Sequence, residues 1–381
     1  MRVGIGFTFP GSIHFEGKEI YPLRIAGDTL QAYWLIKHLM DDVSFSSVSE
    51  NNDINHLFYF DFSYFISSVD IKLGLTPNFF NFLYYNLFVS ASYFTRFFSR
   101  YFTGLAFLLK KLKFFFKNYD AIKNFSRWFI EKQKIKYVIF SSEWEKSQFV
   151  TFLKDLGIHV ERLNLIVMDN FIDFEEIDYA LDVSWSYLKI IKDLPKEYIL
   201  ILSRFDRVKN IHPFIISYYR NRINRDLPVV IVGTIQDYDV DYYKTLKSFE
   251  GKEVKIINVN SFLDFVEDSR KRYLVTRAIS LGLIKSCYVV TIPSLVESFG
   301  YVGIEGLYLG KPVVVTQNSP YPEILGQYVN KSLKLIDPLR LDLNYDLFCF
   351  SEYIYIGDYL RQRFDAKQIC KKYLKIWQDC R

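Results

Sequence analysis

Five apolar runs rich in β-branched residues punctuate the second half of the chain and limit its fold more than any other feature. They span residues 198–205, 228–234, 254–259, 287–294 and 311–317. Stretches of helical length separate them, and this alternation is typical of β-α-β units that build a parallel sheet. The pattern predicts a doubly wound α/β domain whose ligands bind beyond the carboxyl ends of its strands.

The first half shows the same alternation less regularly. The apolar run 2–9 precedes a helical pattern at 27–40, and the run 137–142 precedes another at 143–157. We therefore expect a second Rossmann-like, doubly wound domain in this half of the chain.

The chain length also favours two domains, because 381 residues are many for a single hydrophobic core. We expect a Rossmann-like N-terminal domain at 1–185 and a Rossmann-like C-terminal domain at 186–352, with the linker in the acidic stretch 171–195. The basic, helical segment 353–381 precedes no further strand, so we expect it to cross back to the N-terminal domain.

Composition argues against several classes of protein. Half of the residues are hydrophobic and 24% are charged, as in globular rather than disordered chains. Residues 73–95 carry no charge over a length that could span a bilayer, but three Asn and one Pro argue against a membrane span. The four cysteines form neither a C-x-x-C pair nor a metal-ligand spacing, which fits a reducing cytoplasm. They are Cys287, Cys349, Cys370 and Cys380.

Two carboxylates, Glu297 and Glu305, lie eight positions apart in the glycine-rich stretch 296–306. A helix is expected to begin at Ser298 or Phe299, which puts Glu297 in the strand-to-helix loop and Glu305 about two turns further along. Carboxylates accept strong charge-assisted hydrogen bonds, so this spacing suits a ligand rich in hydroxyl groups. In the alternative interpretation, Glu297 only caps the helix and Glu305 is a solvated helix residue.

The segment 293–316 resembles, nearly position by position, the E-x7-E segment of retaining GT-B glycosyltransferases of the GT4-type family, also called glycosyltransferase group 1. The resemblance implies that Glu297 contacts the donor sugar and that Glu305 binds the ribose of the sugar nucleotide. It also implies that backbone N–H groups of the loop face sugar and phosphate oxygens. These are the N–H groups of Ser298, Phe299 and Gly300.

Two cations follow the first strand of the C-terminal domain. Arg204 comes at its end and Lys209 just before the next helix, an element that resembles the family's GR…K sequence with Ser203 where Gly is common. The resemblance implies that Arg204 and Lys209 neutralise the leaving diphosphate. Arg207 is a competing cation, and in the alternative interpretation all of them are solvated loop charges.

Other elements agree with the family in order. The segment 163–176 resembles the end of its N-terminal domain, Gly233 the strand turn on the nucleotide side, and Gly27 the glycine at the first helix. The usual Gly-Gly pair is incomplete at Gly27, which puts phosphate contact there in doubt. His14 and His56 are candidates for the histidine that the family uses against the donor sugar, with His56 preferred over His14; in the alternative they are ordinary surface or core histidines. The resemblance extends over residues 137–330 and is only general before them.

One pattern points elsewhere. Asp237, Asp239 and Asp241 form two overlapping D-x-D patterns, the metal-nucleotide signature of GT-A glycosyltransferases. Acidic residues are also common at helix starts, where the helix dipole favours them. We therefore expect no metal site.

The segment 79–136 contains eleven Lys and Arg and two acidic residues, a net charge of +9 against +5 for the whole chain. Its aromatic and basic residues suit an anionic membrane surface, which would make a lipid-linked acceptor accessible. The alternatives are helices of the N-terminal domain with a basic outer face, and nucleic-acid binding, which we do not expect.

Together these features predict a GT-B fold, with two Rossmann-like domains facing each other across a cleft. The resemblance implies a hexosyltransferase (EC 2.4) that uses a UDP- or GDP-linked donor sugar, retains the anomeric configuration and needs no metal or other cofactor. We expect a cytoplasmic protein, peripheral to the inner face of the membrane. The alternative function is a catalytically silent scaffold that binds a nucleotide sugar or a lipid; a phosphorylase would require a phosphate site or pyridoxal phosphate, whose segment is not recognisable.

Overall fold

The computed structural model describes most of the C-terminal half of the chain and shorter parts of the N-terminal half. The described residues are 1–6, 13–16, 19–22, 27–47, 53–57, 73–75, 135–155, 157–161, 163–189, 191, 193–221, 227–235, 240–263, 266 and 268–379. They form two compact units. Unit 1 comprises Met1–Ser12, Asp28–Asn170 and Lys367–Arg381, and unit 2 comprises Ile13–Gly27 and Phe171–Ala366.

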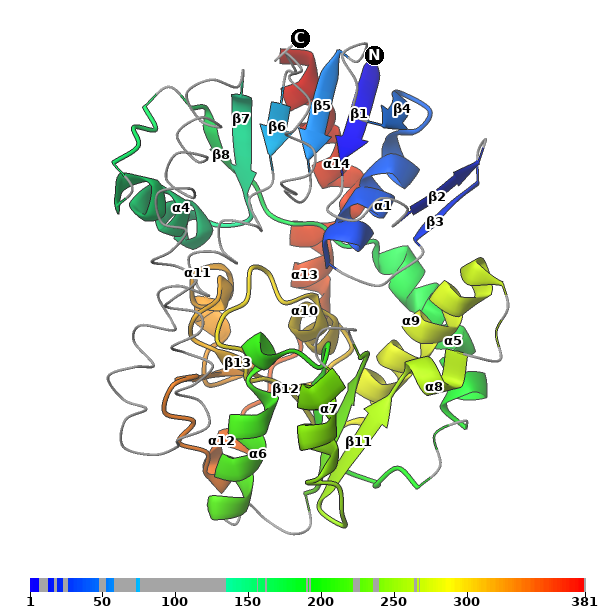
Figure 1. Cartoon of the computed structure of the whole chain (residues 1–381), viewed down its shortest axis with the longest axis vertical. Helices are drawn as coiled ribbons and strands as arrows, with labels where there is room; N and C mark the ends of the chain where they lie inside the picture. The colour runs from blue at the N-terminus through cyan, green and yellow to red at the C-terminus, as the bar shows by residue number, and fades with distance from the viewer. Residues whose placement is uncertain are drawn as a thin grey trace. The chain divides into compact units, whose positions relative to one another are not determined.

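Unit 1 is built on a parallel sheet with strand order β4-β1-β5-β6-β7-β8. The strands are β1 (Arg2–Gly6), β4 (Ser44–Ser47), β5 (Ile54–Leu57), β6 (Leu73–Leu75), β7 (Ile135–Phe140) and β8 (Leu165–Val167). The helices are α1 (Gly27–Leu39), α4 (Glu143–Asp155) and α14 (Ala366–Asp379) (Figure 1). The alternation read from the first half of the sequence is thus an α/β unit.

The C-terminal helix α14 packs into unit 1 through aromatic side chains. Trp377 and Tyr373 are buried, and the Trp377 ring meets Phe45 edge-on at 6.1 Å between centroids. Gln31 of α1 donates a hydrogen bond to the Tyr373 hydroxyl. The segment expected to cross back therefore divides, because α13 (Gly357–Phe364) belongs to unit 2 and α14 to unit 1.

Unit 2 contains a second parallel sheet, with strand order β11-β10-β9-β12-β13-β14. Its strands are β9 (Ile199–Leu202), β10 (Val229–Gly233), β11 (Val254–Asn258), β12 (Val289–Ile292), β13 (Val313–Thr316) and β14 (Leu333–Ile336). Each of the five apolar runs contains one strand, since a parallel strand covered on both faces is apolar at consecutive positions. The sixth strand, β14, was not predicted.

Helices cover this sheet (Figure 1). They are α5 (Phe174–Leu188), α6 (Ile211–Arg220), α7 (Val240–Lys247), α8 (Asn260–Leu263), α9 (Ser269–Ser286), α10 (Tyr301–Tyr308), α11 (Tyr321–Ile324), α12 (Tyr345–Phe348) and α13. Among the described residues, Arg207–Lys209 and Gly326–Tyr328 are single turns of 3₁₀ helix, and β2 (Ile13–Glu16) pairs with β3 (Glu19–Pro22) as a hairpin. Among the described residues, no helix has the length and apolar character needed to cross a bilayer.

The stretch expected to be a linker is largely helix α5, which packs along α9 (Figure 1). A Cβ at Gly282 of α9 would lie 2.8 Å from Leu188, so the two helices approach closely. Apolar residues of α5 such as Ile177 and Ala180 are buried, whereas Trp185 and acidic residues such as Asp182 are exposed. The second segment of unit 2 begins at Phe171, and the predicted division after residue 185 falls inside this helix.

Candidate active site

The loops after β9 and β12 meet at the centre of the unit 2 sheet. These strands are adjacent, and the order of the following strands runs outward in opposite directions from them. Such a switch point is where ligands bind in open α/β sheets. The backbone N–H of Leu295 donates to the Val208 carbonyl at 2.8 Å, which ties the two loops together.

Asn210 fixes the junction between these loops. It is buried, adopts a left-handed conformation with φ of 57°, and its side-chain amide donates to the carbonyls of Pro293 and Pro338 at 3.1 and 2.8 Å. Asp206 caps the preceding 3₁₀ turn by accepting from the Val208 N–H at 3.0 Å. The position of Lys209, between these two contacts, is therefore set by backbone geometry.

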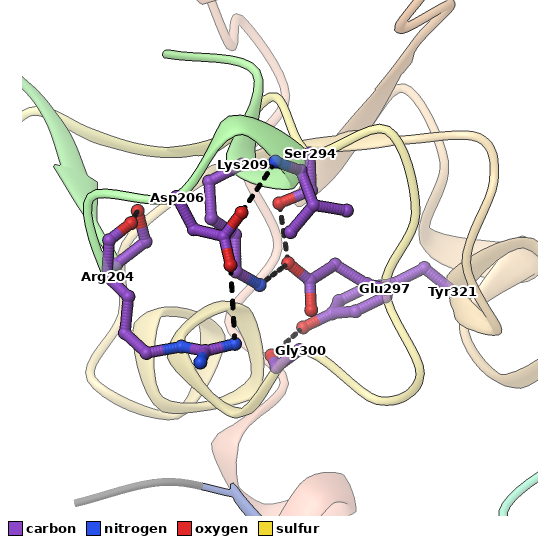
Figure 2. Close-up of polar contacts among 9 residues, drawn as sticks. Arg204, Asp206, Lys209, Ser294, Glu297, Gly300 and Tyr321 are labelled. Atoms are coloured by element: carbon purple, nitrogen blue, oxygen red, sulfur yellow. Dashed lines mark hydrogen bonds and ion pairs between the residues drawn. The ribbon is translucent and has the colours of Figure 1, made fainter. Parts of the chain in front are cut away.

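Lys209 and Glu297 form a short ion pair (Figure 2). Lys209 Nζ donates to Glu297 Oε1 at 2.6 Å, and Ser294 Oγ donates to the same oxygen at 2.6 Å. The two charged side chains are only 19% and 11% exposed, so water screens the pair weakly. The structure thus joins one residue from each of the two predicted motifs.

The other predicted cation, Arg204, lies at the outer side of this cluster (Figure 2). Its Nη2 is 3.9 Å from Asp206 Oδ2, and its side chain is 40% exposed. Arg207, the competing cation, stacks its guanidinium over the Tyr242 ring at 4.9 Å. Lys209 therefore joins the cluster at the switch point, Arg204 lies beside it near Asp206, and Arg207 stacks on α7.

Helix α10 begins at Tyr301, after Gly300, rather than at the predicted Ser298 or Phe299. Gly300 is the N-cap residue and has φ of 74°, a left-handed conformation that glycine adopts readily. The helix therefore does not extend to residues before Tyr301. Ser298 is half-buried in the loop, and the buried Phe299 ring packs edge-on against Phe364 at 5.6 Å. No side chain of the described residues caps α10, so its first N–H groups suit an anion.

Tyr321, which was not predicted from the sequence, binds this loop through its hydroxyl group. Its hydroxyl donates to the Gly300 carbonyl at 2.6 Å, and its side chain is fully buried (Figure 2). Burial, reinforced by the charges of Glu297 and Glu305, raises the pKa of Tyr321 well above its ordinary value. The hydroxyl therefore stays protonated and remains a donor.

A methyl group on Gly303 should disrupt this arrangement. A Cβ at Gly303 would collide with the Tyr321 hydroxyl and lie 2.9 Å from Ile292 Cδ1. We expect Gly303→Ala to lower the free energy of unfolding by about 1–3 kcal/mol, as overpacking does. Denaturant unfolding measures this change. Gly326→Ala is the matched control because a Cβ there has nothing within 4 Å, and equal losses in both variants would contradict the prediction.

Glu305 is buried within unit 2. It is 2% exposed, and Arg277 Nη1 of α9 donates to its Oε1 at 2.7 Å. The alternative interpretation of the two glutamates is therefore wrong, because Glu305 is not solvated and Glu297 does not cap α10. Burial alone would lower the pKa of the Arg277 guanidinium, but Glu305, Tyr273 and Glu176 together raise it above its ordinary value.

For the remaining predicted residues, the structure describes some positions only at the level of the backbone. Gly233 ends β10, where a Cβ would collide with the Ser203 carbonyl oxygen at the end of β9. Gly27 is the first residue of α1, and His14 and His56 lie in β2 and β5. The side-chain positions of these two histidines fall outside the described part of the chain, as do Asp237 and Asp239. Asp241 is exposed at the start of α7, 3.3 Å from Lys244.

Residues 189–334, which contain both loops of the switch point, match the family model described as Glycosyl transferases group 1. The match covers less than half of the chain and shows that this segment is similar to group 1 glycosyl transferases. The matched range contains Arg204, Lys209, Glu297 and Glu305, and the predicted resemblance to glycosyltransferase group 1 is confirmed. No curated protein gives a significant match to the chain.

Several solved structures are similar to this chain over most or all of its length. HepE from Anabaena in complex with UDP-glucose has a TM-score of 0.63 at 14% identity, with 100% of both chains covered. Sucrose-phosphate synthase from Thermosynechococcus elongatus has a TM-score of 0.57 at 12% identity, covering 99% of this chain and 88% of that chain. The α,α-trehalose 6-phosphate synthase from Burkholderia multivorans has a TM-score of 0.52 at 9% identity, covering 93% and 78%. The segment matched by the family model thus lies in a chain with the predicted GT-B fold.

Proposed function

We propose that this chain is a hexosyltransferase (EC 2.4) that moves a sugar from a UDP- or GDP-linked donor to an acceptor hydroxyl, with retention and without a metal ion. The observation that carries the proposal is the Lys209–Glu297 pair at the switch point of the domain matched to group 1 glycosyl transferases. The solved structures of HepE with UDP, with UDP and glucose, and with UDP-glucose support a nucleotide-sugar donor.

The proposed mechanism uses the two loops for opposite parts of the donor. Arg204 and Lys209 bind the diphosphate, and Glu297 accepts a hydrogen bond from a sugar hydroxyl. The bond from sugar C1 to the diphosphate oxygen breaks, its electron pair leaves with the nucleoside diphosphate, and the acceptor oxygen bonds to C1 as the acceptor proton is released. Negative charge grows on the departing diphosphate, and fixed cations stabilise such charge most strongly where water is excluded.

Bound diphosphate must share Lys209 with Glu297. Without a ligand the lysine neutralises the carboxylate, which avoids a buried unpaired charge. Ser294 donates to the same carboxylate oxygen and keeps Glu297 oriented when Lys209 turns to the donor. Glu305 then accepts from the ribose, and the N–H groups of the loop 298–300 face sugar and phosphate oxygens.

A nucleotide panel tests the proposal. UDP or GDP at 100 times its dissociation constant should raise the free energy of unfolding by about 2.7 kcal/mol, measured as a thermal shift. Release of nucleoside diphosphate from the donor sugar should follow in the presence of a chelator. Binding without any release, across a panel of acceptors, would favour the silent scaffold, and rescue by Mn²⁺ would revive Asp237 and Asp239 as metal ligands.

The acceptor side of the proposal concerns segment 79–136, which lies outside the described residues apart from its last two, at the start of β7. Each basic residue near an anionic leaflet contributes about 1 kcal/mol. We infer that this segment holds the protein at the inner face of the membrane beside a lipid-linked acceptor, with no nucleic-acid partner.

The purified protein should therefore cosediment with anionic vesicles, and salt should weaken the association. Neutralising four lysines of the segment together should reduce binding several-fold. The four are Lys110, Lys111, Lys113 and Lys117. The matched control neutralises four exposed lysines elsewhere, Lys244, Lys252, Lys371 and Lys372. Equal binding to neutral and anionic vesicles, or none, would indicate a solvated basic face and a soluble acceptor.

A further inference from the structure

Four polar side chains from three helices meet in the interior of unit 2. Glu176 of α5, Tyr273 and Arg277 of α9, and Glu305 of α10 are 8%, 6%, 2% and 2% exposed. Arg277 lies between the two carboxylates, with Nη1 at 2.7 Å from Glu305 and Nε at 3.9 Å from Glu176. The Tyr273 hydroxyl donates to Glu176 on the far side. Buried contacts thus link Glu305 to α9 and α5.

Stability alone explains this cluster poorly. Taking charges out of water costs free energy, and an apolar group of similar volume often serves as well as a buried ion pair. Among the described residues, Nε and Nη2 of Arg277 have no hydrogen-bond partner, and buried donors left unpaired are unfavourable. Glu176, Arg277 and Glu305 are all charged, so the cluster buries three charged side chains, and the arrangement calls for a role beyond holding the helices together.

The geometry fixes one oxygen of Glu305 only. An arginine fork can bind both oxygens of a carboxylate, but here Nη2 makes no hydrogen bond and Nη1 reaches Oε1 alone. The backbone of α10 is also held closely at this point, because a Cβ on Gly306 would lie 3.0 Å from Val290 of β12. Glu305 therefore has a fixed backbone and one oxygen held by a hydrogen bond. Its other oxygen, Oε2, receives no hydrogen bond from Arg277.

We propose that Arg277 is the positioning residue for ribose recognition, holding Oε1 of Glu305 so that Oε2 accepts hydrogen bonds from the donor's ribose hydroxyls. Arg277 itself does not touch the nucleotide. Glu176 and Tyr273 hold the opposite side of the guanidinium and keep it from turning away from Glu305. The inference deepens the proposed function and depends on it.

The test compares ribonucleotides with their deoxy analogues, because loss of a ribose hydroxyl matters only if Glu305 is correctly placed. The probes are UDP and GDP with the 2′-deoxy and 3′-deoxy forms of each, measured by calorimetry. In the wild-type protein one deoxy form should bind roughly tenfold more weakly, the scale of a lost hydrogen bond to a charged group. Arg277→Met should bring this ratio close to one, and Arg277→Lys should restore part of it.

Tyr198→Phe is the matched control. Tyr198 is buried and donates to the Leu283 carbonyl of α9 at 2.9 Å, so its loss perturbs the same helix without touching the cluster. It should keep the wild-type ratio. A wild-type ratio in both Arg277 variants, or an equal loss of ratio in Tyr198→Phe, would overturn the inference, and Arg277→Lys decides the matter if Arg277→Met does not fold. Failure of wild-type protein to bind any nucleotide would instead overturn the proposed function.

Discussion

Replacing Lys209 with alanine should lower kcat by about 10²–10³-fold, the loss seen when one donor to a developing negative charge is removed. Donor affinity should fall less, because charge on the leaving diphosphate grows between the bound state and the transition state. The structure adds a second reason. Lys209 is 2.6 Å from Glu297, so its removal leaves a nearly buried carboxylate beside the diphosphate with one neutralising charge fewer.

Steady-state kinetics and donor binding, measured on the same preparations, separate these effects. Arg204→Ala should also lower kcat, but by less than Lys209→Ala. The Arg204 side chain is more exposed, so water screens its charge more strongly. Arg207→Ala is the control on the same turn, since its guanidinium stacks on Tyr242. If Lys209→Ala changed only KM, or if Arg207→Ala lost as much turnover, the assignment of Lys209 to the diphosphate would be wrong.

The fold could be predicted from the sequence because its signals are local. Buried parallel strands produce consecutive apolar residues, and the five runs of unit 2 needed no knowledge of their neighbours in space. The start of α10 was misplaced although Gly300 carried the correct signal, a glycine that takes a left-handed conformation before a helix. Helix α5 replaces most of the predicted linker because its apolar stripe, Phe174, Ile177 and Ala180, is buried, although exposed acidic residues lie on the same helix.

Site residues were predicted only where they belong to a short sequence motif. Glu297 and Glu305 share one short segment, and Lys209 belongs to another, so each could be found separately. Arg277 and Tyr321 could not be found in this way. Their contacts join residues that lie 28 and 21 positions apart in the sequence, and no motif with a fixed spacing contains them. Packing of α9 against α10 and of the loop after β13 against Gly300 creates those contacts, and only the folded chain contains them.

Replacing Glu305 with alanine should weaken nucleotide-sugar binding by roughly 1.5–3 kcal/mol, the contribution of a hydrogen bond to a charged acceptor. It should also destabilise the protein by about 3–5 kcal/mol, because Arg277 would remain buried without its partner. A loss of stability could be mistaken for a loss of binding. Binding must therefore be measured on protein that circular dichroism shows to be folded at the assay temperature.

Glu305→Gln separates these effects further. The amide keeps the shape of the side chain and one acceptor oxygen, so stability should suffer less than with alanine, while the ribose loses its charged partner. Glu175→Ala removes an exposed carboxylate of unit 2 and should change neither quantity. Wild-type affinity in Glu305→Gln, together with the expected loss of stability in Glu305→Ala, would mean that Glu305 is only the counter-charge of Arg277. Loss of affinity in both variants, with the deoxy-nucleotide ratio abolished, is the result that assigns the carboxylate to the ribose.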